Sequence, residues 1–326
     1  MLKELCMLCG TSGYENEVIS FIENFLIEND ISYKKDNLGN ITAFCGNEPH
    51  KIALMAHTDE VGFGVRGFTD KGMIKFASVG GILEKILPSS CVLVGPDKIN
   101  GVIGNKPKHL KDDKEAKLTY DDLFIDIGAK NKDDAKKYVK IGDPIYFNSD
   151  YVEFGDGLIK AKALDDRAGV YLILELLKEK KYSFTACFNT REEIGIFGAK
   201  TVAPTLNVKR ALILEVTTCA DMPDTKIKTT VLGEGPALSV MDGGSVSDSD
   251  FNNEILNIAK KNKIKLQKKL TVFGGNDAGA IGYRSGGIKT AVISLPGRHI
   301  HSPTSVISKY DLENAHQLLK RLLEEI

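Results

Sequence analysis

Side chains that commonly bind metal ions occur in five short segments of this sequence. Each segment lies at a predicted strand end or in the loop after one, and the segments are His57-Thr58-Asp59, Asp165-Asp166-Arg167, Arg191-Glu192-Glu193, Glu215 and His299-Ile300-His301. Any one of them taken alone is most simply a solvated loop residue. Their joint occurrence indicates one site, because the loops at the carboxyl ends of strands in an open α/β sheet converge on one crevice.

The candidate ligands predict a site for two divalent cations, and they are His57, Asp165, Glu193, Glu215 and His301. Their three carboxylates carry three negative charges, so one divalent cation leaves one charge uncompensated. Two cations with one hydroxide give a neutral centre that tolerates partial burial. Nitrogen and oxygen ligands without sulfur suit zinc, cobalt or manganese, and we expect zinc or cobalt.

Two further carboxylates are predicted to act at this centre without binding metal. Asp59 follows His57 by two residues, so both side chains lie on one face of a strand, and Asp59 can accept the second imidazole N–H. In the adjacent Glu192-Glu193 pair, neighbouring side chains of an extended segment diverge. One carboxylate can therefore bind metal while the other remains free as a general base for metal-activated water.

The composition is that of an ordinary globular protein. Of the 326 residues, 42% are hydrophobic and 27% charged, and 43 Lys and Arg against 44 Asp and Glu give a net charge of −1. This balance does not favour a nucleic-acid partner. No apolar run is long enough to span a membrane and the first residues lack an export signal, so we expect no membrane partner and a cytoplasmic location. The six cysteines, with Cys6 and Cys9 as a C-x-x-C pair, are expected to be reduced and without a role.

Two kinds of sequence pattern indicate the elements that position these residues: strands alternating with helices, and a region of many short strands. Strands are predicted over 41–45, 52–56, 185–189, 211–216 and 290–295, and helices over 168–178, 251–263 and 312–325. Thr11-Ser12-Gly13 precedes apolar residues at helical spacing, which predicts a capped amphipathic helix. Between Arg66 and Asp156, short apolar runs broken by Gly, Pro and lysine-rich loops, such as 106–117, predict a small β-barrel. We expect an α/β catalytic domain of residues 1–66 and 157–326, with a barrel domain of residues 67–156 inserted into it.

On these residues the sequence resembles the tetrahedral aminopeptidases of peptidase family M42, over essentially the whole chain. The ordered motifs that carry the resemblance include Ala56-His57-Thr58-Asp59-Glu60, Ala163-Leu164-Asp165-Asp166-Arg167, Glu192-Glu193-Ile194-Gly195, Gly274-Gly275-Asn276-Asp277-Ala278 and Arg298-His299-Ile300-His301. The resemblance implies a zinc-peptidase-like α/β/α sandwich in which the inserted barrel is a PDZ-like dimerisation domain. It also implies self-association, in which dimers often assemble into a hollow tetrahedral dodecamer that admits only unfolded peptides.

Carried over by position, the resemblance assigns a role to each candidate. It implies that His57 and Glu215 hold one metal, that Glu193 and His301 hold the other, and that Asp165 bridges them. Glu192 is then the general base.

Two positions depart from the family pattern. Glu215 stands where we expect Asp, and the extra methylene moves the carboxylate by about 1 to 1.5 Å, which predicts altered geometry or affinity at that metal. His299 stands where Tyr is commoner. It alternates with His301 on an extended segment and is a competing ligand in principle, but only His301 matches the family position.

The sequence therefore predicts a metal-dependent aminopeptidase that removes N-terminal residues from peptides. Two alternatives remain open: a deacylase of small amides on the same metal centre, and a non-catalytic metal-binding scaffold subunit. Asp277 is predicted either to bind the substrate amine or to cap a helix. Arg298 is predicted either to contact substrate or to pair with a core carboxylate, and Arg167 to act as a structural clamp.

Overall fold

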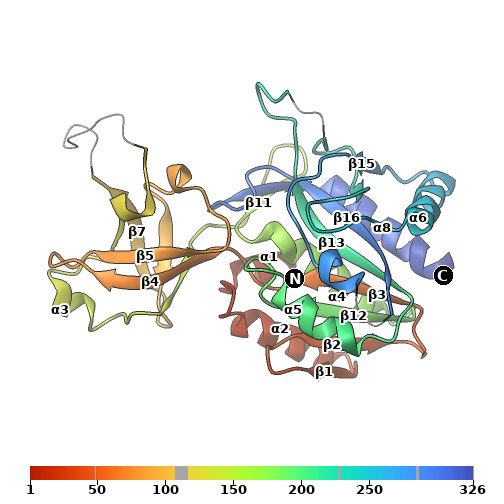
Figure 1. Cartoon of the computed structure of the whole chain (residues 1–326), viewed down its shortest axis with the longest axis horizontal. Helices are drawn as coiled ribbons and strands as arrows, with labels where there is room; N and C mark the ends of the chain where they lie inside the picture. The colour runs from red at the N-terminus through yellow and green to blue at the C-terminus, as the bar shows by residue number, and fades with distance from the viewer. Residues whose placement is uncertain (48, 107–116, 227–228, 284–285, 326) are drawn as a thin grey trace.

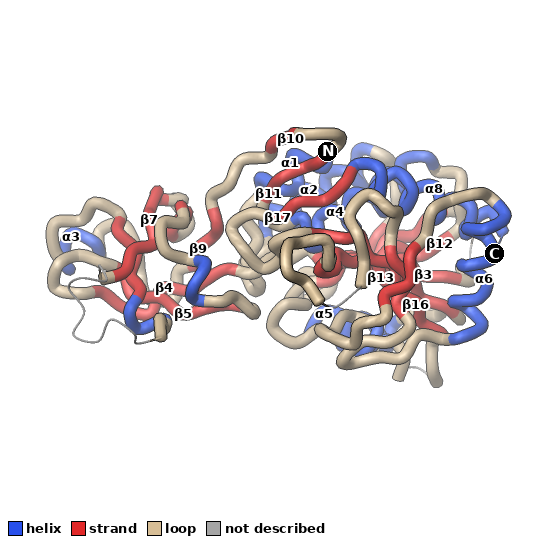
Figure 2. The backbone as a smooth tube through the Cα atoms, turned by 90° about the horizontal axis from the view of Figure 1, so that it is seen from above, coloured by secondary structure: helices blue, strands red, loops and turns tan. Residues whose placement is uncertain are grey.

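The protein consists of an α/β body and a β-barrel that extends from one end of it (Figures 1 and 2). The computed structural model describes residues 1–47, 49–106, 117–226, 229–283 and 286–325. Apart from its two ends, the predicted loop 106–117 lies outside these residues. None of the helices within these ranges is long and apolar enough to cross a membrane.

An eight-stranded sheet forms the centre of the body within the described residues. Its strand order is β1 (Tyr33–Lys35), β2 (Ile41–Cys45), β12 (Phe184–Asn189), β3 (Ile52–His57), β13 (Arg210–Thr218), β16 (Lys289–Gly297), β14 (Ala237–Ser239) and β15 (Gln267–Lys269). The central strands β12, β3, β13 and β16 run parallel. Every residue of β3 and β12 is buried, in keeping with strands covered on both faces.

Helices cover both faces of this sheet and make a three-layer sandwich. One face packs against α1 (Leu2–Met7), α2 (Asn16–Glu28), α4 (Leu164–Glu179), α6 (Ser249–Lys261) and α8 (Lys309–Glu325). The other packs against α5 (Phe197–Val202), the 3-10 turn η4 (Ala203–Thr205) and α7 (Ala278–Ile281). Because side chains alternate along a strand, Leu212 and Leu214 enter the first core, while Ala211 and Ile213 enter the second.

The barrel closes six strands on themselves, so it has no free sheet edge. Around the barrel the strands are β4 (Gly62–Phe68), β5 (Ile74–Val79), β8 (Leu123–Asp126), β7 (Ile99–Asn105), β6 (Cys91–Val94) and β9 (Pro144–Phe147). Short helices η1 (Glu84–Ile86), η3 (Tyr120–Asp122) and α3 (Lys132–Ala135) lie in its connections. Phe63 packs edge-on against Phe76 and Phe147 in its centre, at centroid distances of 5.0 and 5.2 Å.

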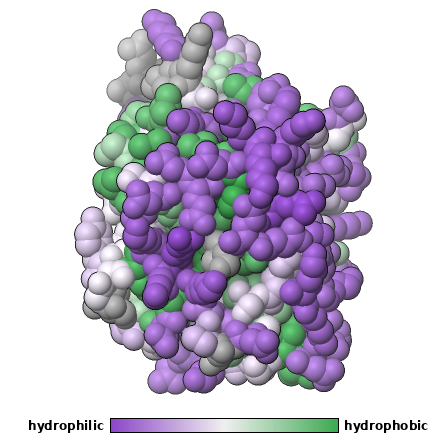
Figure 3. Space-filling model, turned by 90° about the vertical axis from the view of Figure 1, so that its right-hand side faces the viewer, coloured by the Kyte–Doolittle hydropathy of each residue, from purple (hydrophilic) through white to green (hydrophobic). Residues whose placement is uncertain are grey.

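A small antiparallel sheet returns the chain from the barrel to the body. It contains β10 (Val152–Phe154), β11 (Leu158–Ala161) and β17 (Ser305–Ser308), with Ala161 opposite Ser305. The end of the body opposite the barrel carries mostly hydrophilic side chains (Figure 3).

The predicted fold class and elements are confirmed, with one correction at a helix end. Every predicted strand and helix is present within a few residues of its expected limits. The cap predicted for the helix after Thr11-Ser12-Gly13 is wrong, because Glu15 occupies the N-cap position of α2 and no side chain caps it. Thr11 instead donates to the Ile145 carbonyl and Ser12 to Asp59, so both hydroxyls bind distant parts of the chain. The barrel strands lie between Gly62 and Phe147, and the domain limits at 67 and 156 stay a prediction.

Candidate metal centre

The five predicted metal ligands come from separate elements that meet at one edge of the sheet. His57 ends β3, and Glu215 lies in the neighbouring parallel strand β13, where the register pairs Met55 with Ile213 two residues earlier. Asp165 follows β11 and His301 precedes β17. Because Ala161 at the end of β11 is opposite Ser305 at the start of β17, Asp165 in the first turn of α4 and His301 both lie at this end of the small sheet. Glu193 lies between β12 and α5.

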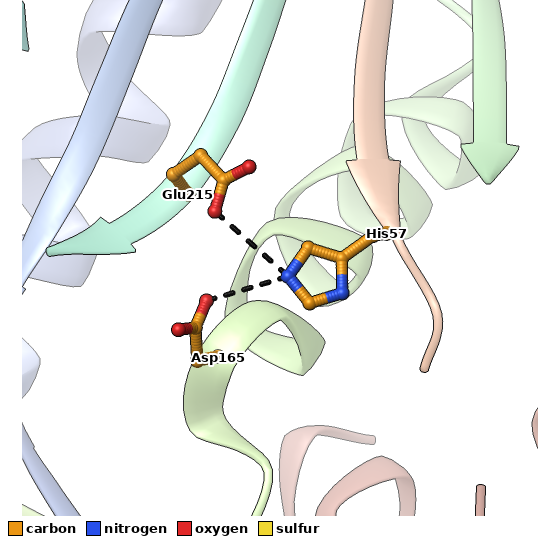
Figure 4. A group of neighbouring side chains, drawn as sticks. All are labelled: His57, Asp165 and Glu215. Atoms are coloured by element: carbon orange, nitrogen blue, oxygen red, sulfur yellow. Dashed lines mark ion pairs between the residues drawn. The ribbon is translucent and has the colours of Figure 1, made fainter. Parts of the chain in front are cut away.

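The ligand atoms form two groups that share Asp165. In the first group, His57 Nε2 lies 3.4 Å from Asp165 Oδ1 and 3.8 Å from Glu215 Oε2 (Figure 4). In the second, His301 Nε2 lies 3.7 Å from Asp165 Oδ2 and 3.5 Å from Glu193 Oε2. Within each group one ligand atom per residue lies within 4.8 Å of the others. Asp165 thus presents one oxygen to each group, which is the arrangement required of a bridging carboxylate.

Both imidazoles present the same ring atom to these groups. His57 Nδ1 is 3.2 Å from the Asp59 carbonyl oxygen, and His301 Nδ1 is 2.9 Å from the Gly81 carbonyl oxygen. A proton on each Nδ1 leaves the Nε2 lone pair directed at the carboxylates, as a metal-binding histidine requires. Exposed His299 lines the same cavity but belongs to neither ligand group among the described residues.

The electrostatics of the cluster fit divalent cations. Burial, followed by the charge of Asp165, raises the pKa of Glu193 to about 8. Burial and neighbouring carboxylates also raise the pKa of Glu215 well above its usual range. Asp165 Oδ1 is buried without a hydrogen-bond partner. Carboxylates crowded in this way are stabilised by a cation, because it supplies positive charge and accepts the lone pairs of their oxygens.

Glu192 lies beside the ligand groups without belonging to either one in the described structure. It lines the same cavity. Burial, then the charges of Asp277 and Glu193 against the opposing effect of His57, raises its pKa to about 9. A free carboxylate in such surroundings is a strong base for its type, which suits proton transfer from water.

Asp59 connects the His57 strand to the Glu192-Glu193 segment. Its Oδ1 accepts the backbone N–H of Glu192 at 3.0 Å, and its Oδ2 accepts that of Glu193 at 3.1 Å and the Ser12 hydroxyl at 2.6 Å. His57 Nδ1 is 3.4 Å from Asp59 Oδ1. Sequence spacing suggested only the histidine contact, because the other partners lie far away along the chain.

The sequence did not predict a group of buried charged side chains that lies next to the metal-binding residues. The Lys162 ammonium donates to Glu60 Oε1 at 2.6 Å, and both side chains are about 3% exposed. Arg167, fully buried, donates to the carbonyls of Thr58 and Leu5 at 2.9 and 2.6 Å, which confirms its predicted clamping role. Nothing in the spacing of Glu60 and Lys162 identifies them as a pair, since 102 positions separate them.

The two predicted substrate contacts lie outside the cavity lining. Asp277 is 1% exposed and accepts the Asn189 amide at 2.7 Å. It occupies the N-cap position of α7 but makes no side-chain cap hydrogen bond. Arg298 forms a two-pronged pair with Asp221, at 3.1 and 2.6 Å. The structure therefore favours pairing for Arg298, and a substrate contact for either residue stays a prediction.

One large cavity opens at the metal centre. Its volume is about 1150 Å³, and its lining includes His57, Asp165, Glu192, Glu193, Glu215 and His301. Apolar side chains lie at its rim, among them Leu83 and Phe273, which are 60% and 67% exposed. The cavity is large enough for several residues of an extended peptide.

Comparison with known proteins gives a consistent result. The family model described as M42 glutamyl aminopeptidase matches residues 39–318. A protein of Acetivibrio thermocellus that is named as an aminopeptidase is 34% identical, over 98% of this chain and 96% of its own. The lysyl aminopeptidase of Pyrococcus furiosus is 29% identical, over 100% and 96%.

Solved structures show the same similarity in three dimensions. A TET aminopeptidase from a marine-sediment Thaumarchaeota archaeon superposes with a TM-score of 0.96 at 32% identity, covering 100% of this chain and 96% of that chain. The TET1 peptidase of Pyrococcus horikoshii, described as assembling into a tetrahedron or a large octahedral shell, gives a TM-score of 0.89 at 31% identity, with coverage of 100% and 98%.

Proposed function

The chain belongs to the M42 glutamyl aminopeptidase family, and from this premise we propose how it acts as a metal-dependent aminopeptidase. It hydrolyses the N-terminal peptide bond at a centre of two divalent cations. His57 and Glu215 would hold one cation, Glu193 and His301 would hold the other, and Asp165 would contribute one oxygen to each. Zinc or cobalt fits this nitrogen and oxygen ligand set.

The single observation that carries the two-metal proposal is the position of Asp165. Its two oxygens face different ligand groups, at 3.4 Å from His57 and 3.7 Å from His301. When bound, two divalent cations polarise the scissile carbonyl and lower the pKa of water. The Glu215 side chain, although longer than the expected Asp, reaches the first ligand group.

The protein's own residues supply orientation and proton transfer. Glu192 takes a proton from the attacking water and returns it to the leaving amine. Asp59 fixes the backbone of Glu192 and Glu193 relative to His57 through its hydrogen bonds. The cavity walls hold the peptide with its N-terminus against the centre.

Metal analysis combined with a substrate comparison tests this function. We expect close to two zinc or cobalt ions per chain, rapid hydrolysis of aminoacyl anilides, and no hydrolysis of the corresponding N-acetyl anilides. Preferred hydrolysis of the acetylated substrates indicates a deacylase instead. Less than one bound metal and no activity after zinc or cobalt is supplied indicates a non-catalytic scaffold.

We further propose that the barrel mediates self-association into a tetrahedral dodecamer that acts on unfolded peptides. On the barrel, the apolar side chains of Ile141 and Val102 are 69% and 46% exposed, so both are available to a second copy of the barrel. The described assembly of the Pyrococcus horikoshii relative supports the same proposal. Light scattering should give a mass of twelve chains, and charged substitutions at Ile141 and Val102 should reduce it.

A further inference from the structure

A glycine pair of the barrel lies against the second ligand group of the metal centre, which contains Asp165, Glu193 and His301. The pair is Gly80 and Gly81, which follow β5 and precede η1. Gly81 also lines the cavity of the centre. The inserted barrel therefore reaches the site as well as extending from the body.

The Gly81 carbonyl orients His301. It lies 2.9 Å from His301 Nδ1, although 220 positions separate the two residues. The His301 side chain is 38% exposed, whereas that of His57 is 1% exposed. Packing restrains the buried His57 ring, but the more exposed His301 ring depends on a hydrogen bond for its orientation. By accepting from Nδ1, the Gly81 carbonyl directs Nε2 at Asp165 and Glu193.

Gly80 lies beside Glu193, the other ligand that belongs to the second group alone. Its φ is +86°, and a Cβ atom added there would lie 2.8 Å from Val61 Cγ1 and 3.5 Å from Glu193 Cβ. An alanine would combine the strain of a left-handed backbone with this overlap. Glycine thus lets the barrel backbone lie beside Glu193 and still present the next carbonyl to His301.

The first ligand group is oriented from within the α/β body. His57 Nδ1 lies 3.2 Å from the Asp59 carbonyl oxygen. Glu215 lies in β13, which is paired with β16 along its whole length. Neither contact involves the barrel, and Asp165 is the ligand that the two groups share. A displacement of the glycine pair should therefore affect the second group more than the first.

Contacts between the barrel and the body hold the glycine pair in place. The Thr11 hydroxyl donates to the Ile145 carbonyl of β9 at 3.2 Å. Lys98 Nζ, at the turn between β6 and β7, lies 2.7 Å from Glu17 Oε1 of α2. The barrel is thus fixed to the body at points remote in sequence from the glycine pair.

On the basis of the two-cation centre proposed above, we propose that Gly80 and Gly81 of the barrel position Glu193 and His301 to bind the second cation. The barrel then forms part of the metal centre in addition to its role in self-association. The two cations differ as a result. The first depends on contacts within the body, and the second also depends on where the barrel presents this glycine pair.

Gly80→Ala tests the proposal, because its methyl group would overlap Val61 and displace the pair. Titration of zinc with a competing chelator measures the two binding steps, and His301→Ala identifies the step that belongs to the second group. In Gly80→Ala that step should weaken by about 10- to 100-fold, as when a contact that supports a metal ligand is lost. The other step should stay unchanged, which also shows that the variant is folded.

Gly128→Ala is the matched control. Gly128 has a φ of +77° in the same barrel, and among the described residues no atom beyond its chain neighbours lies within 4 Å of a Cβ added there. This variant carries the backbone strain without the overlap, so both steps should stay unchanged. The proposal is overturned if Gly128→Ala weakens the second step as much as Gly80→Ala does, or if Gly80→Ala weakens both steps equally.

Val61→Ala, combined with Gly80→Ala, gives a second test. It removes the Cγ1 atom that would overlap the new methyl group, so the double variant should regain part of the affinity lost at the second step. Val61 is 7% exposed, so its truncation also removes apolar burial and should lower Tm further. Affinity and stability then change in opposite directions, which general damage to the fold does not produce.

A double variant that binds the second zinc no better than Gly80→Ala overturns the proposal. Failure of the two-cation centre itself gives a different result, since the wild-type chain would then bind a single zinc ion. The titration of the wild-type chain therefore separates the two failures.

Discussion

The barrel and the metal-binding edge of the sheet bury different kinds of side chain. Among the described residues between Gly62 and Phe147, the buried side chains are apolar apart from the hydroxyl of Tyr146, and none is charged. At the sheet edge the chain buries His57, Asp59, Asp165 and Glu60 together. Burial of apolar surface stabilises a fold, whereas burial of like charges destabilises it. The comparison indicates that the barrel stabilises the folded protein. The metal-binding edge of the sheet destabilises it, because the carboxylates that form the cation site repel one another.

The metal-binding edge of the sheet keeps its geometry because buried ion pairs and hydrogen bonds hold the backbone next to it. Arg167 and the Lys162–Glu60 pair hold the backbone of the His57-Thr58-Asp59-Glu60 segment. Asp59 then holds Glu192 and Glu193. The carboxylates of the metal centre repel one another, and these surrounding ion pairs and hydrogen bonds therefore hold them in place.

Glu192→Gln should give the largest change and should separate activity from stability. Loss of the general base should lower kcat by about 10² to 10⁴, with metal content unchanged by elemental analysis. In the metal-free protein the raised pKa of Glu192, about 9, means that the folded state binds more protons than the unfolded state between its usual range and pH 9. Stability therefore falls as pH rises through that window, and the neutral glutamine should raise Tm there.

The control for this variant is Glu313→Gln on the exposed face of α8, which should change neither kcat nor Tm. A Glu192→Gln enzyme with its metals bound and near-normal turnover would show that another group is the base.

Phe63→Ala should damage the barrel and spare the chemistry. Phe63 is fully buried against Phe76 and Phe147, so the cavity should lower the free energy of unfolding by about 3 to 5 kcal/mol. Denaturant unfolding measures this loss. Tyr138→Ala, at an aromatic side chain of the barrel domain that is 50% exposed, should lose far less. If both variants lose the same amount, the barrel's aromatic core is not the source of its stability.

Glu215→Asp should change metal affinity at the metal-binding edge of the sheet without changing its charge. The shorter side chain withdraws the carboxylate from His57 by about 1 to 1.5 Å, and the first ligand group loses its present spacing. We expect metal affinity at that position to fall by about 10- to 100-fold, as when a supporting contact is lost. Titration with a competing chelator measures it. Tighter binding in the variant would show that glutamate weakens this site.

His316→Gln should give the smallest effect. It tests how a partly buried histidine away from the metal centre makes stability depend on pH. Burial, then the charge of Lys320, lowers the pKa of His316 despite nearby Glu179. Below pH 6.5 the unfolded chain then binds more protons, so the wild-type protein loses stability as pH falls, while at pH 7.5 both states are neutral. From pH 7.5 to 5.5 the variant should gain less than about 1 kcal/mol relative to wild type in denaturant unfolding. A difference that stays constant with pH contradicts this.

The sequence by itself determined the element pattern and the chemistry-bearing residue types. Strand 52–56 and helix 168–178 followed from apolar periodicity, which depends on neighbours a few residues apart. The contact between His57 and Asp59 was expected from their spacing on one strand; the two side chains do lie 3.4 Å apart, but β3 ends at His57 and Asp59 lies beyond it. The capping role expected for Thr11 and Ser12 failed, because their hydroxyls bind the distant Ile145 and Asp59.

Only the tertiary structure decided which distant groups meet. The two oxygens of Asp165 face separate ligand groups because β11 pairs with β17 and β3 lies beside β13. The Glu60–Lys162 pair likewise depends on which distant segments the fold brings side by side. Local patterns reflect interactions within a few residues, whereas contacts between remote segments depend on how the whole chain packs.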